Sequence, residues 1–467
     1  MHNDEQNTFR DTLGIVNKEG KRTWLYPKKP KGRYYTARTI LSSFFLLILF
    51  GTPFIKLNNY PIVLFNIIER KFILFGIPFG PHDFYILALM MITFIVFIIL
   101  FTLVYGRVFC GWICPQTVFM EMIFRKIDYW IEGDAKEQKR LNESPWNKEK
   151  IFKKFSKYGI YFSLSFLIAN TFLAYIIGID ELWNIITVPP SQHLTGFISI
   201  LVFTSVFYGV FIWFREQACI LVCPYGRLQG VLLDKNSIVI AYDYPRGEPR
   251  KKIQRNETRT AGDCIDCKQC VEVCPTGIDI RNGTQLECVN CTACIDACDY
   301  VMEKIQKPKG LIRYASSEQI KNKIPMRFTS RMSGYSFVLL FLLTIVSYSL
   351  ITRTEIDVTI LRTPKLFFQE QVDGRISNVY DVKILNKTFH PQKLSFQLQD
   401  REGEIALGEK VITILPQEIV EKKFIIFLKK EYIQTMNTVV MIEIYDEKNT
   451  LVHTIQTSFL GPVNKKM

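Results

Sequence analysis

Residues 264–275 read CIDCKQCVEVCP, and residues 288–299 repeat the same cysteine spacing as CVNCTACIDACD. Both copies are C-x2-C-x2-C-x3-C, the bacterial pattern for two [4Fe-4S] clusters that exchange their fourth cysteines. Three thiolates on one short loop bind three irons of a cube, and the fourth, leaving on a helix, reaches the other cube. The spacing therefore predicts a ferredoxin-like insert with one cluster on Cys264, Cys267, Cys270 and Cys298 and a second cluster on Cys288, Cys291, Cys294 and Cys274.

Two other uses of paired cysteines fit this spacing less well. Zinc sites use two widely separated pairs rather than three cysteines in close succession. Disulfides belong to oxidising compartments, whereas all twelve cysteines lie in segments that the charge pattern described below places in the cytoplasm. The second copy has Asp299 in the position of Pro275, so its ligand set is intact and only its local chain path departs from the motif.

Apolar runs flank the cysteine-rich insert on both sides. Five of them contain no Asp, Glu, Lys or Arg: Thr39–Ile55, Phe84–Tyr105, Tyr158–Ile179, Leu194–Phe214 and Met332–Thr352. A bilayer core of ~30 Å needs about 17–25 helical residues, so we expect five transmembrane helices. The segment Ile62–Phe79 is also apolar, but Glu69, Arg70 and Lys71 interrupt it, which favours an interfacial or re-entrant segment.

Basic residues are distributed unevenly between the loops. Lys and Arg crowd before the first apolar run and between the second and third, whereas Asp180–His193 has neither. Cytoplasmic loops carry such an excess. We therefore expect a bacterial inner-membrane protein whose N-terminus, 106–157 loop and 215–331 segment are cytoplasmic and whose residues 353–467 are periplasmic. Basic flanks beside the anionic lipid bilayer account for the net charge of +14, so we expect no nucleic-acid partner.

The four remaining cysteines form two copies of another motif. Cys110 and Cys114 follow the second apolar run, Cys219 and Cys223 follow the fourth, and both pairs read C-x3-C-P. Two membrane crossings separate the runs, so both pairs emerge on the same face and can converge on one site. Soft thiolates select monovalent copper, zinc or iron–sulfur centres. Simple packing of small cysteine side chains is the alternative.

The residues around the C-x3-C-P pairs lead to two local expectations. Proline moves the residue before it out of the α conformation, so Cys114 and Cys223 are expected at a helix end or turn. Arg107 and Arg215 lie just before the two motifs, and nearby cations favour thiolate over thiol.

The apolar pattern changes to period two after the last run. Leu394, Phe396 and Leu398 alternate with polar residues, and short apolar segments follow at Val411–Leu415, Phe424–Leu428 and Val439–Tyr445. This spacing predicts an immunoglobulin-like sandwich of about seven strands. The whole chain then divides into a basic N-terminus (1–38), a membrane domain with four spans (39–245), a ferredoxin-like domain (246–331), a fifth transmembrane helix (332–352) and the β-sandwich (353–467).

These parts, in this order, resemble the cytochrome c oxidase accessory protein family, called CcoG, FixG or RdxA. The resemblance covers nearly the whole chain and includes both C-x3-C-P motifs, the two-cluster insert and the outer β-domain. It implies a membrane polyferredoxin that acts as a cupric reductase and delivers Cu(I) for assembly of a cbb3-type oxidase. Copper would then be a substrate or transient ligand of Cys110, Cys114, Cys219 and Cys223. The implied partners are oxidase subunits or a copper chaperone, and no flavin or nicotinamide fingerprint identifies the electron donor.

A second family shares part of this pattern. Residues 84–300 also resemble quinol dehydrogenase subunits of the NapH type, through the same paired C-x3-C-P and ferredoxin motifs. That resemblance implies quinol oxidation and onward electron transfer. The additional outer domain favours the oxidase-assembly family.

Overall fold

The structure is a computed structural model of the 467-residue chain. It describes residues 21–57, 59–68, 71–80, 83–252, 261–323, 329–364, 366–399, 403–433 and 435–462. The chain divides into two compact units, one formed by Met1–Ile55 and Leu89–Ile345 and the other by Lys56–Ala88 and Val346–Met467. The part of the basic N-terminus before Lys21 lies outside the described residues.

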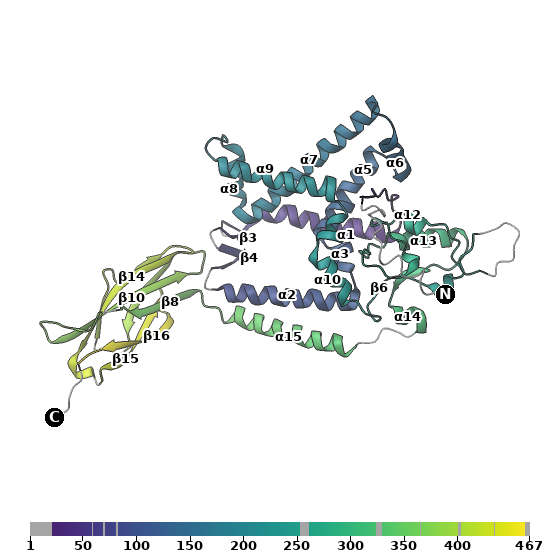
Figure 1. The fold of residues 1–467 in the computed structure, drawn as a ribbon. Coiled ribbons are helices and arrows are strands. Elements are labelled where there is room, and N and C mark those ends of the chain that lie inside the picture. Colours follow the sequence, from purple (N-terminus) through teal and green to yellow (C-terminus); the bar gives the residue numbers. More distant parts are fainter. Residues whose placement is uncertain are drawn as a thin grey trace. The chain divides into compact units, whose positions relative to one another are not determined.

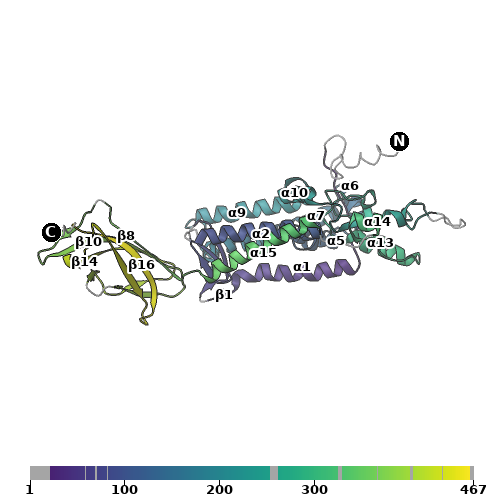
Figure 2. The ribbon, with the colours of Figure 1, turned by 90° about the horizontal axis from the view of Figure 1, so that it is seen from below.

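Five helices within the described ranges are long and apolar enough to cross a membrane, which agrees with the five predicted spans. They are α1 (Arg33–Gly51), α2 (Phe84–Tyr105), α7 (Lys148–Ile177), α9 (Leu194–Gly209) with the π-helical turn η4 (Val210–Phe214), and α15 (Ser330–Ile351). Helix α1 gives way to a 3-10 turn, η1 (Thr52–Phe54), at Pro53. In Figures 1 and 2, α1, α2, α9 and α15 run roughly parallel to one another.

Aromatic side chains pack between the helices of the first unit. Helix α7 packs against α9, and the Phe124 ring stacks on Phe211 with centroids 4.2 Å apart. Short elements connect the spans: α3 (Val108–Trp112), α4 (Pro115–Thr117), η3 (Val118–Phe124), α5 (Arg125–Ile131), α6 (Ala135–Glu143), α8 (Ile179–Thr187), η5 (Ala218–Val222) and α10 (Pro224–Leu232). These connections position both C-x3-C-P motifs.

The ferredoxin-like insert belongs to the same unit. Strand β6 (Val239–Tyr242) pairs antiparallel with β7 (Ile312–Ala315). The helices between and after these strands are α11 (Tyr244–Gly247), α12 (Gln269–Glu272), η6 (Ile280–Asn282), α13 (Ala293–Lys304) and α14 (Ser317–Asn322). Buried aliphatic side chains from β6, α13 and β7 pack around the cysteines, so the insert has a dry core.

The second unit contains the predicted β-sandwich. One sheet has the order β12 (Gly403–Ala406), β14 (Ile419–Lys429), β10 (Arg375–Asn386), β8 (Ile356–Arg362), with β9 (Gln369–Glu370) beside β10. The other has the order β13 (Ile412–Ile414), β11 (Gln392–Leu398), β15 (Asn437–Tyr445), β16 (Leu451–Leu460). Nine strands are described rather than about seven, because the shortest ones, such as β9, are too short for a period to be visible. Figure 1 shows β8, β10 and β14 in one layer and β15 and β16 in the other.

Residues 56–79 form small sheets in this second unit. Strand β1 (Lys56–Leu57) pairs with β2 (Tyr60–Pro61), and β3 (Val63–Asn66), β4 (Lys71–Leu74) and β5 (Ile77–Phe79) form a three-stranded sheet. These strands do not exclude the re-entrant interpretation of Ile62–Phe79, because non-helical backbone at membrane depth is tolerated where protein buries it. The interfacial position stays a prediction, and Glu69 and Arg70 lie outside the described residues.

Candidate functional site

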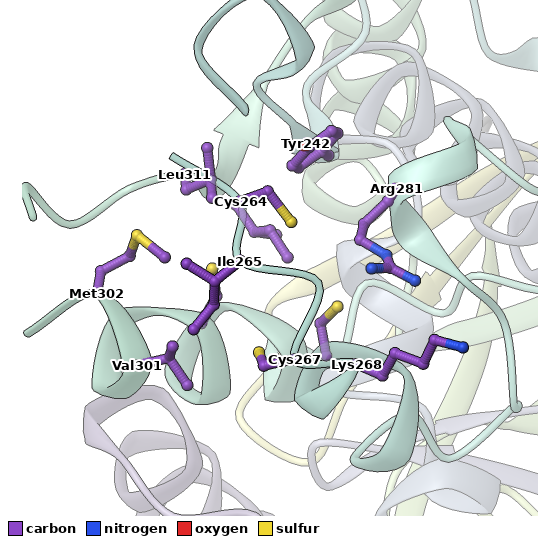
Figure 3. Close-up of a pocket in the computed structure, with 12 residues that line it drawn as sticks. Tyr242, Cys264, Ile265, Cys267, Lys268, Arg281, Val301, Met302 and Leu311 are labelled. Atoms are coloured by element: carbon purple, nitrogen blue, oxygen red, sulfur yellow. The ribbon is translucent and has the colours of Figure 1, made fainter. Parts of the chain in front are cut away.

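Four thiols line a small cavity between α12, α13 and the loop before α12. They belong to Cys264, Cys267, Cys270 and Cys298, which we call the first quartet. Figure 3 shows the apolar side chains of Ile265, Val301, Met302 and Leu311 around this cavity. Cys267 is exposed, whereas Cys264, Cys270 and Cys298 are buried. The first quartet therefore has one edge open to solvent.

A second cavity is lined by the other four ferredoxin thiols, Cys274, Cys288, Cys291 and Cys294, which we call the second quartet. Cys270 also reaches this cavity, and the remaining walls include Ile240, Ile278, Ile280 and Val289. Helix α13 carries Cys294 of the second quartet and Cys298 of the first. One helix thus connects the two cavities.

The two cysteine loops have the same backbone conformation. Asp266 and Lys268 have φ values of 49° and 56°, and the equivalent Asn290 and Thr292 have φ values of 53° and 66°. Non-glycine residues rarely adopt this left-handed region, and they cluster at functional sites. Here the left-handed residues turn each loop tightly enough for three closely spaced cysteines to face one cavity.

The two quartets fit iron–sulfur clusters in both geometry and chemistry. Burial raises the pKa of Cys270 and Cys288 to about 12 and that of Cys291 to about 11, so positively charged iron would have to offset the cost of burying thiolates. Within the described residues, no three or more His, Cys, Asp or Glu side chains approach closely enough to bind a single ion. A cube does not need such a shared ion position, because each of its thiolates binds a different iron.

The two C-x3-C-P motifs share an unusual turn. The Cys114 amide donates to the Phe109 carbonyl and the Cys223 amide to the Ala218 carbonyl, both at 2.9 Å and both five residues back. Each second cysteine then leaves the helical region, with ψ values of 123° and 111°, and the following proline begins α4 or α10. The predicted helix end at Cys114 and Cys223 is confirmed. Such π-type turns occur frequently at functional sites.

The four thiols of these motifs come together near α10. The Cys110 thiol donates to Gln229 Oε1 at 3.2 Å, and the Cys219 carbonyl packs against Gly226. Burial raises the pKa of Cys110 to about 11 and that of Cys219 to about 12, and the neighbouring thiols of Cys114 and Cys223 add to both shifts. The motifs therefore form one half-buried thiol group, which would lose protons on binding a soft metal.

The two arginines expected beside this thiol group behave differently. Arg107 opposes the raised pKa of Cys110, as predicted. Arg215 does not act on Cys219, because its guanidinium binds the Asp128 carboxylate. Arg107 and Arg215 do not occupy equivalent positions in the two motifs. Arg215 lies four residues before Cys219 and has a φ of 50°. The residue four before Cys110 is Gly106, with a φ of 56°, so Arg215 corresponds to Gly106 rather than to Arg107.

The first C-x3-C-P motif packs directly onto the second quartet. A Cβ atom on Gly111, which lies between Cys110 and Cys114, would be only 2.7 Å from the Asn290 carbonyl oxygen and closer still to the Val289 carbonyl. Only glycine allows this approach of α3 to the Cys288–Cys291 loop. The Trp112 indole extends the contact by donating to Tyr314 Oη at 3.2 Å.

Two buried arginines join the thiol group to the same loop. Arg38 Nε donates to the Gly111 carbonyl at 3.0 Å, and its Nη1 donates to the Cys291 carbonyl at 2.9 Å. Arg107 Nε donates to Gln229 Oε1 at 2.6 Å, and its Nη1 donates to the Cys288 carbonyl at 3.4 Å and to the Leu286 carbonyl. Each guanidinium therefore contacts both the C-x3-C-P region and the Cys288–Cys291 loop of the second quartet.

Several of these residues have no distinctive signal in the sequence. Arg38 appears there only as one of many basic residues before the first span, and Gln229 and Tyr314 belong to no motif. Arg281, which lines the first cavity, is equally inconspicuous. Their importance depends on contacts between segments far apart in the chain.

Three protein-family models match the chain. The model described as "4Fe-4S dicluster domain" matches residues 214–317, "4Fe-4S binding domain" matches residues 87–133, and "IG-like fold at C-terminal of FixG" matches residues 346–462. The cysteines within residues 87–133 are Cys110 and Cys114. That model therefore associates the first C-x3-C-P pair with iron–sulfur binding.

Curated relatives match most of the chain. Protein RdxA of Cereibacter sphaeroides is 35% identical over 82% of this chain and 83% of its own length. Protein RdxB of the same organism is 32% identical (88% and 90% covered), and the nitrogen fixation protein FixG of Rhizobium meliloti is 31% identical (81% and 80% covered). A solved FixG-related protein from Vibrio parahaemolyticus is 15% identical, with a TM-score of 0.22, and its match covers 24% of this chain and all of its own.

The apolar helices, the two thiol quartets and the matching iron–sulfur models define a membrane iron–sulfur protein of the electron-transfer class. The chain belongs to the FixG family, which includes RdxA and RdxB.

Proposed function

We propose that the protein is a cupric reductase of the bacterial inner membrane. In this proposal each quartet binds one [4Fe-4S] cluster, which supplies one-electron transfer, and the thiol group of Cys110, Cys114, Cys219 and Cys223 binds copper as a substrate. The Cu(I) product would serve assembly of a cbb3-type oxidase, received by an oxidase subunit or a copper chaperone. The clusters would face the cytoplasm and the β-sandwich the periplasm.

The observation that supports this proposal most is the direct contact between α3 and the Cys288–Cys291 loop. Gly111 brings the thiol group against the backbone of the second quartet, and Arg38 and Arg107 hold both sides. An electron can thus pass from the second quartet to a metal at the thiols over a short protein path. Soft thiolates favour Cu(I) over Cu(II), which drives the reduction.

The test is turnover of Cu(II) by the full-length protein with reconstituted clusters and dithionite as donor. We expect Cys110→Ala and Cys219→Ala to abolish copper binding and reduction while the iron content stays that of the wild type. Met120→Leu, a buried side chain on η3 outside the thiol group, is the matched control and should keep turnover. Unchanged copper reduction in both cysteine variants would refute the proposal. A loss of iron in them would instead assign the thiols to an additional iron–sulfur centre.

A second candidate is a quinol-linked relay. A cavity of about 440 Å³ is lined by residues that include Glu132, Tyr158, Tyr161, Trp213 and Arg215. Aromatic walls and a buried carboxylate suit the head group of a quinol, which releases two protons and two electrons on oxidation. This candidate predicts that quinol alone reduces the clusters and that copper has no effect. If quinol leaves the clusters oxidised, this candidate is excluded.

A further inference from the structure

The two quartets differ in the buried charge that surrounds them. Arg281 lines the first cavity, but its guanidinium is paired with Asp266 and Asp279, each at 2.6 Å. The other cation at that cavity, Lys268, is exposed, so water and salt screen it. Cys298 is followed directly by Asp299, whose charge raises the pKa of that thiol. The net protein charge at the first quartet is therefore not positive.

The second quartet has the opposite environment. Arg38 and Arg107 are 4% and 5% exposed, and both donate to carbonyls of the Cys288–Cys291 loop. Within the described residues, both guanidiniums donate to neutral acceptors, namely backbone carbonyls and the Gln229 side-chain amide. Glu121, which faces the same small cavity as Arg38, is paired with Arg125 at 2.9 Å. Both arginines thus lie beside this quartet without a directly bound carboxylate, and the Glu121 charge offsets only part of the effect of Arg38 on Cys291.

Such charges act on reduction because each electron adds negative charge to a cluster that is already anionic. A buried cation stabilises the reduced form, and low solvent access keeps that effect from being screened. Charge and solvent exposure are among the properties that set iron–sulfur potentials. The two differences act in opposite directions here: water at the exposed Cys267 edge also stabilises a reduced cluster, so the inference requires the two buried arginines to outweigh that hydration.

We infer that Arg38 and Arg107 set the order of the two potentials, placing the second quartet's cluster above that of the first. An electron supplied by a one-electron reductant at the exposed edge near Cys267 then moves from the first quartet to the second. The first cluster is oxidised as the second is reduced, and no atom is transferred. The electron comes to rest beside the C-x3-C-P thiols. Arg38 and Arg107 are positioning residues in this scheme, because their charge acts on the potential through space and neither side chain touches a reacting atom.

This inference rests on the cluster assignment within the proposed function but not on copper. It is tested on the full-length protein in detergent, with reconstituted clusters and no copper, by dithionite titration followed by EPR. Cys267→Ser identifies the signal of the first quartet, because it changes a ligand of that cluster alone. In the wild type, we expect the signal that Cys267→Ser leaves unchanged to appear at the higher potential. The opposite order would overturn the inference whatever happens to copper turnover.

The arginine variants test the cause of that order. Arg38→Met and Arg107→Met should each lower the ratio of reduced to oxidised second cluster at least tenfold at a given potential, which is about 59 mV for one electron. Arg38→Lys keeps the charge and should stay near the wild-type midpoint. Arg33→Met, on the same helix but with a side chain that is 73% exposed and 4.0 Å from Asp299 beside the first quartet, should leave the midpoint of the second cluster unshifted.

Iron content and visible absorbance are measured on every variant. An unshifted midpoint in Arg38→Met and Arg107→Met with intact clusters would overturn the inference. If a methionine variant loses its clusters, the wild-type order and the Arg38→Lys midpoint decide the result.

Discussion

Gly111 is the residue on which the contact between the thiol group and the second quartet depends. An alanine there would place its Cβ against the Val289 and Asn290 carbonyls, and neither backbone group can move without displacing the Cys288–Cys291 loop. We expect Gly111→Ala to lower the free energy of unfolding by about 1–3 kcal/mol, the usual cost of overpacking, and to slow electron transfer to copper. Thermal unfolding and single-turnover reduction in detergent measure the two effects.

Gly159 on α7 provides the matched control for that change. A Cβ at this position would meet no other atom within 4 Å, so Gly159→Ala should leave electron transfer unaltered. It should also be neutral or slightly stabilising, because alanine favours a helix over glycine by about 0.5–1 kcal/mol. Equal behaviour of the two variants would contradict the role assigned to Gly111.

Asp128 is the centre of a buried ion cluster. Its carboxylate accepts from Tyr161 Oη at 2.7 Å and pairs with Lys157 at 2.8 Å and with Arg215. We expect Asp128→Asn to destabilise the first unit by about 3–5 kcal/mol, because it leaves the buried Arg215 without its paired carboxylate, whereas Lys157 keeps Glu132 at 2.9 Å. Thermal unfolding at pH 7 measures the loss. Glu149→Gln, which removes an exposed pair with Lys153, should leave the unfolding temperature close to that of the wild type, because solvent screens such pairs.

The Asp128 carboxylate also gives this stabilisation a pH dependence. Burial opposes its ionisation, but Arg215 and Lys157 outweigh burial and hold the pKa of Asp128 well below the usual value of about 3.9. A depressed native pKa means that the stabilisation is complete above about pH 4 and is lost as the pH falls toward the native pKa. The stability difference between wild type and Asp128→Asn should therefore be constant from pH 8 to about pH 5 and shrink below pH 4. A difference that grows on acidification would contradict this account.

At the scale of elements, helix α1 is capped by another part of the fold. The residue at its N-cap, Gly32, has no side chain to cap it. Instead, the Asp296 carboxylate on α13 accepts the Tyr34 amide at 3.2 Å and the Tyr35 amide at 2.8 Å. This contact also fixes the start of the helix that carries Arg38. The ferredoxin-like insert therefore positions α1 as well as the thiol group.

Asp296→Ala should remove this cap and cost about 1–2 kcal/mol of stability, as other N-cap losses do. Asp296→Asn, which keeps an oxygen acceptor, should retain most of it. Thermal unfolding compares the three proteins, and protease cleavage near residue 32 reports release of the helix start. If the alanine and asparagine variants are equally stable, the hydrogen bonds to Tyr34 and Tyr35 contribute nothing measurable.

At the scale of the whole molecule, the open prediction is which side of the membrane each part occupies. The excess of Lys and Arg predicts that the 106–157 loop is cytoplasmic and that the sandwich is periplasmic. Single cysteines at Lys136 on α6 and at Lys410 beside β13, both exposed, can be labelled with a membrane-impermeant maleimide in intact spheroplasts and in inverted vesicles. Lys410→Cys should react in spheroplasts and Lys136→Cys in inverted vesicles. Labelling of both from the same side would overturn the topology.

Local patterns predicted much of this molecule. Apolar runs indicated the five spans, because the length of a helix can be compared with the thickness of a bilayer without knowing which other segments pack beside it. The period-two segment around Leu394 indicated the sandwich, although the strand number was too low. Proline predicted the turns at Cys114 and Cys223 because its constraint acts on the adjacent residue. The sequence did not predict the strands within residues 63–79. Charges inside a short apolar segment fit both a small β-sheet and a segment at the membrane interface, so they do not distinguish the two.

The sequence by itself determined which chemistry the chain carries: cysteine spacing within a few residues specifies iron–sulfur loops, and apolar length specifies membrane helices. Only the tertiary structure decided how those parts are connected. Four kinds of contact join residues from separate segments of the chain. They are the close approach at Gly111, the hydrogen bonds from Arg38 and Arg107, the pairing of Arg281 with two aspartates, and the ion pair of Arg215 with Asp128. Charge and close packing act through space, whereas a local pattern reports only what lies nearby along the chain.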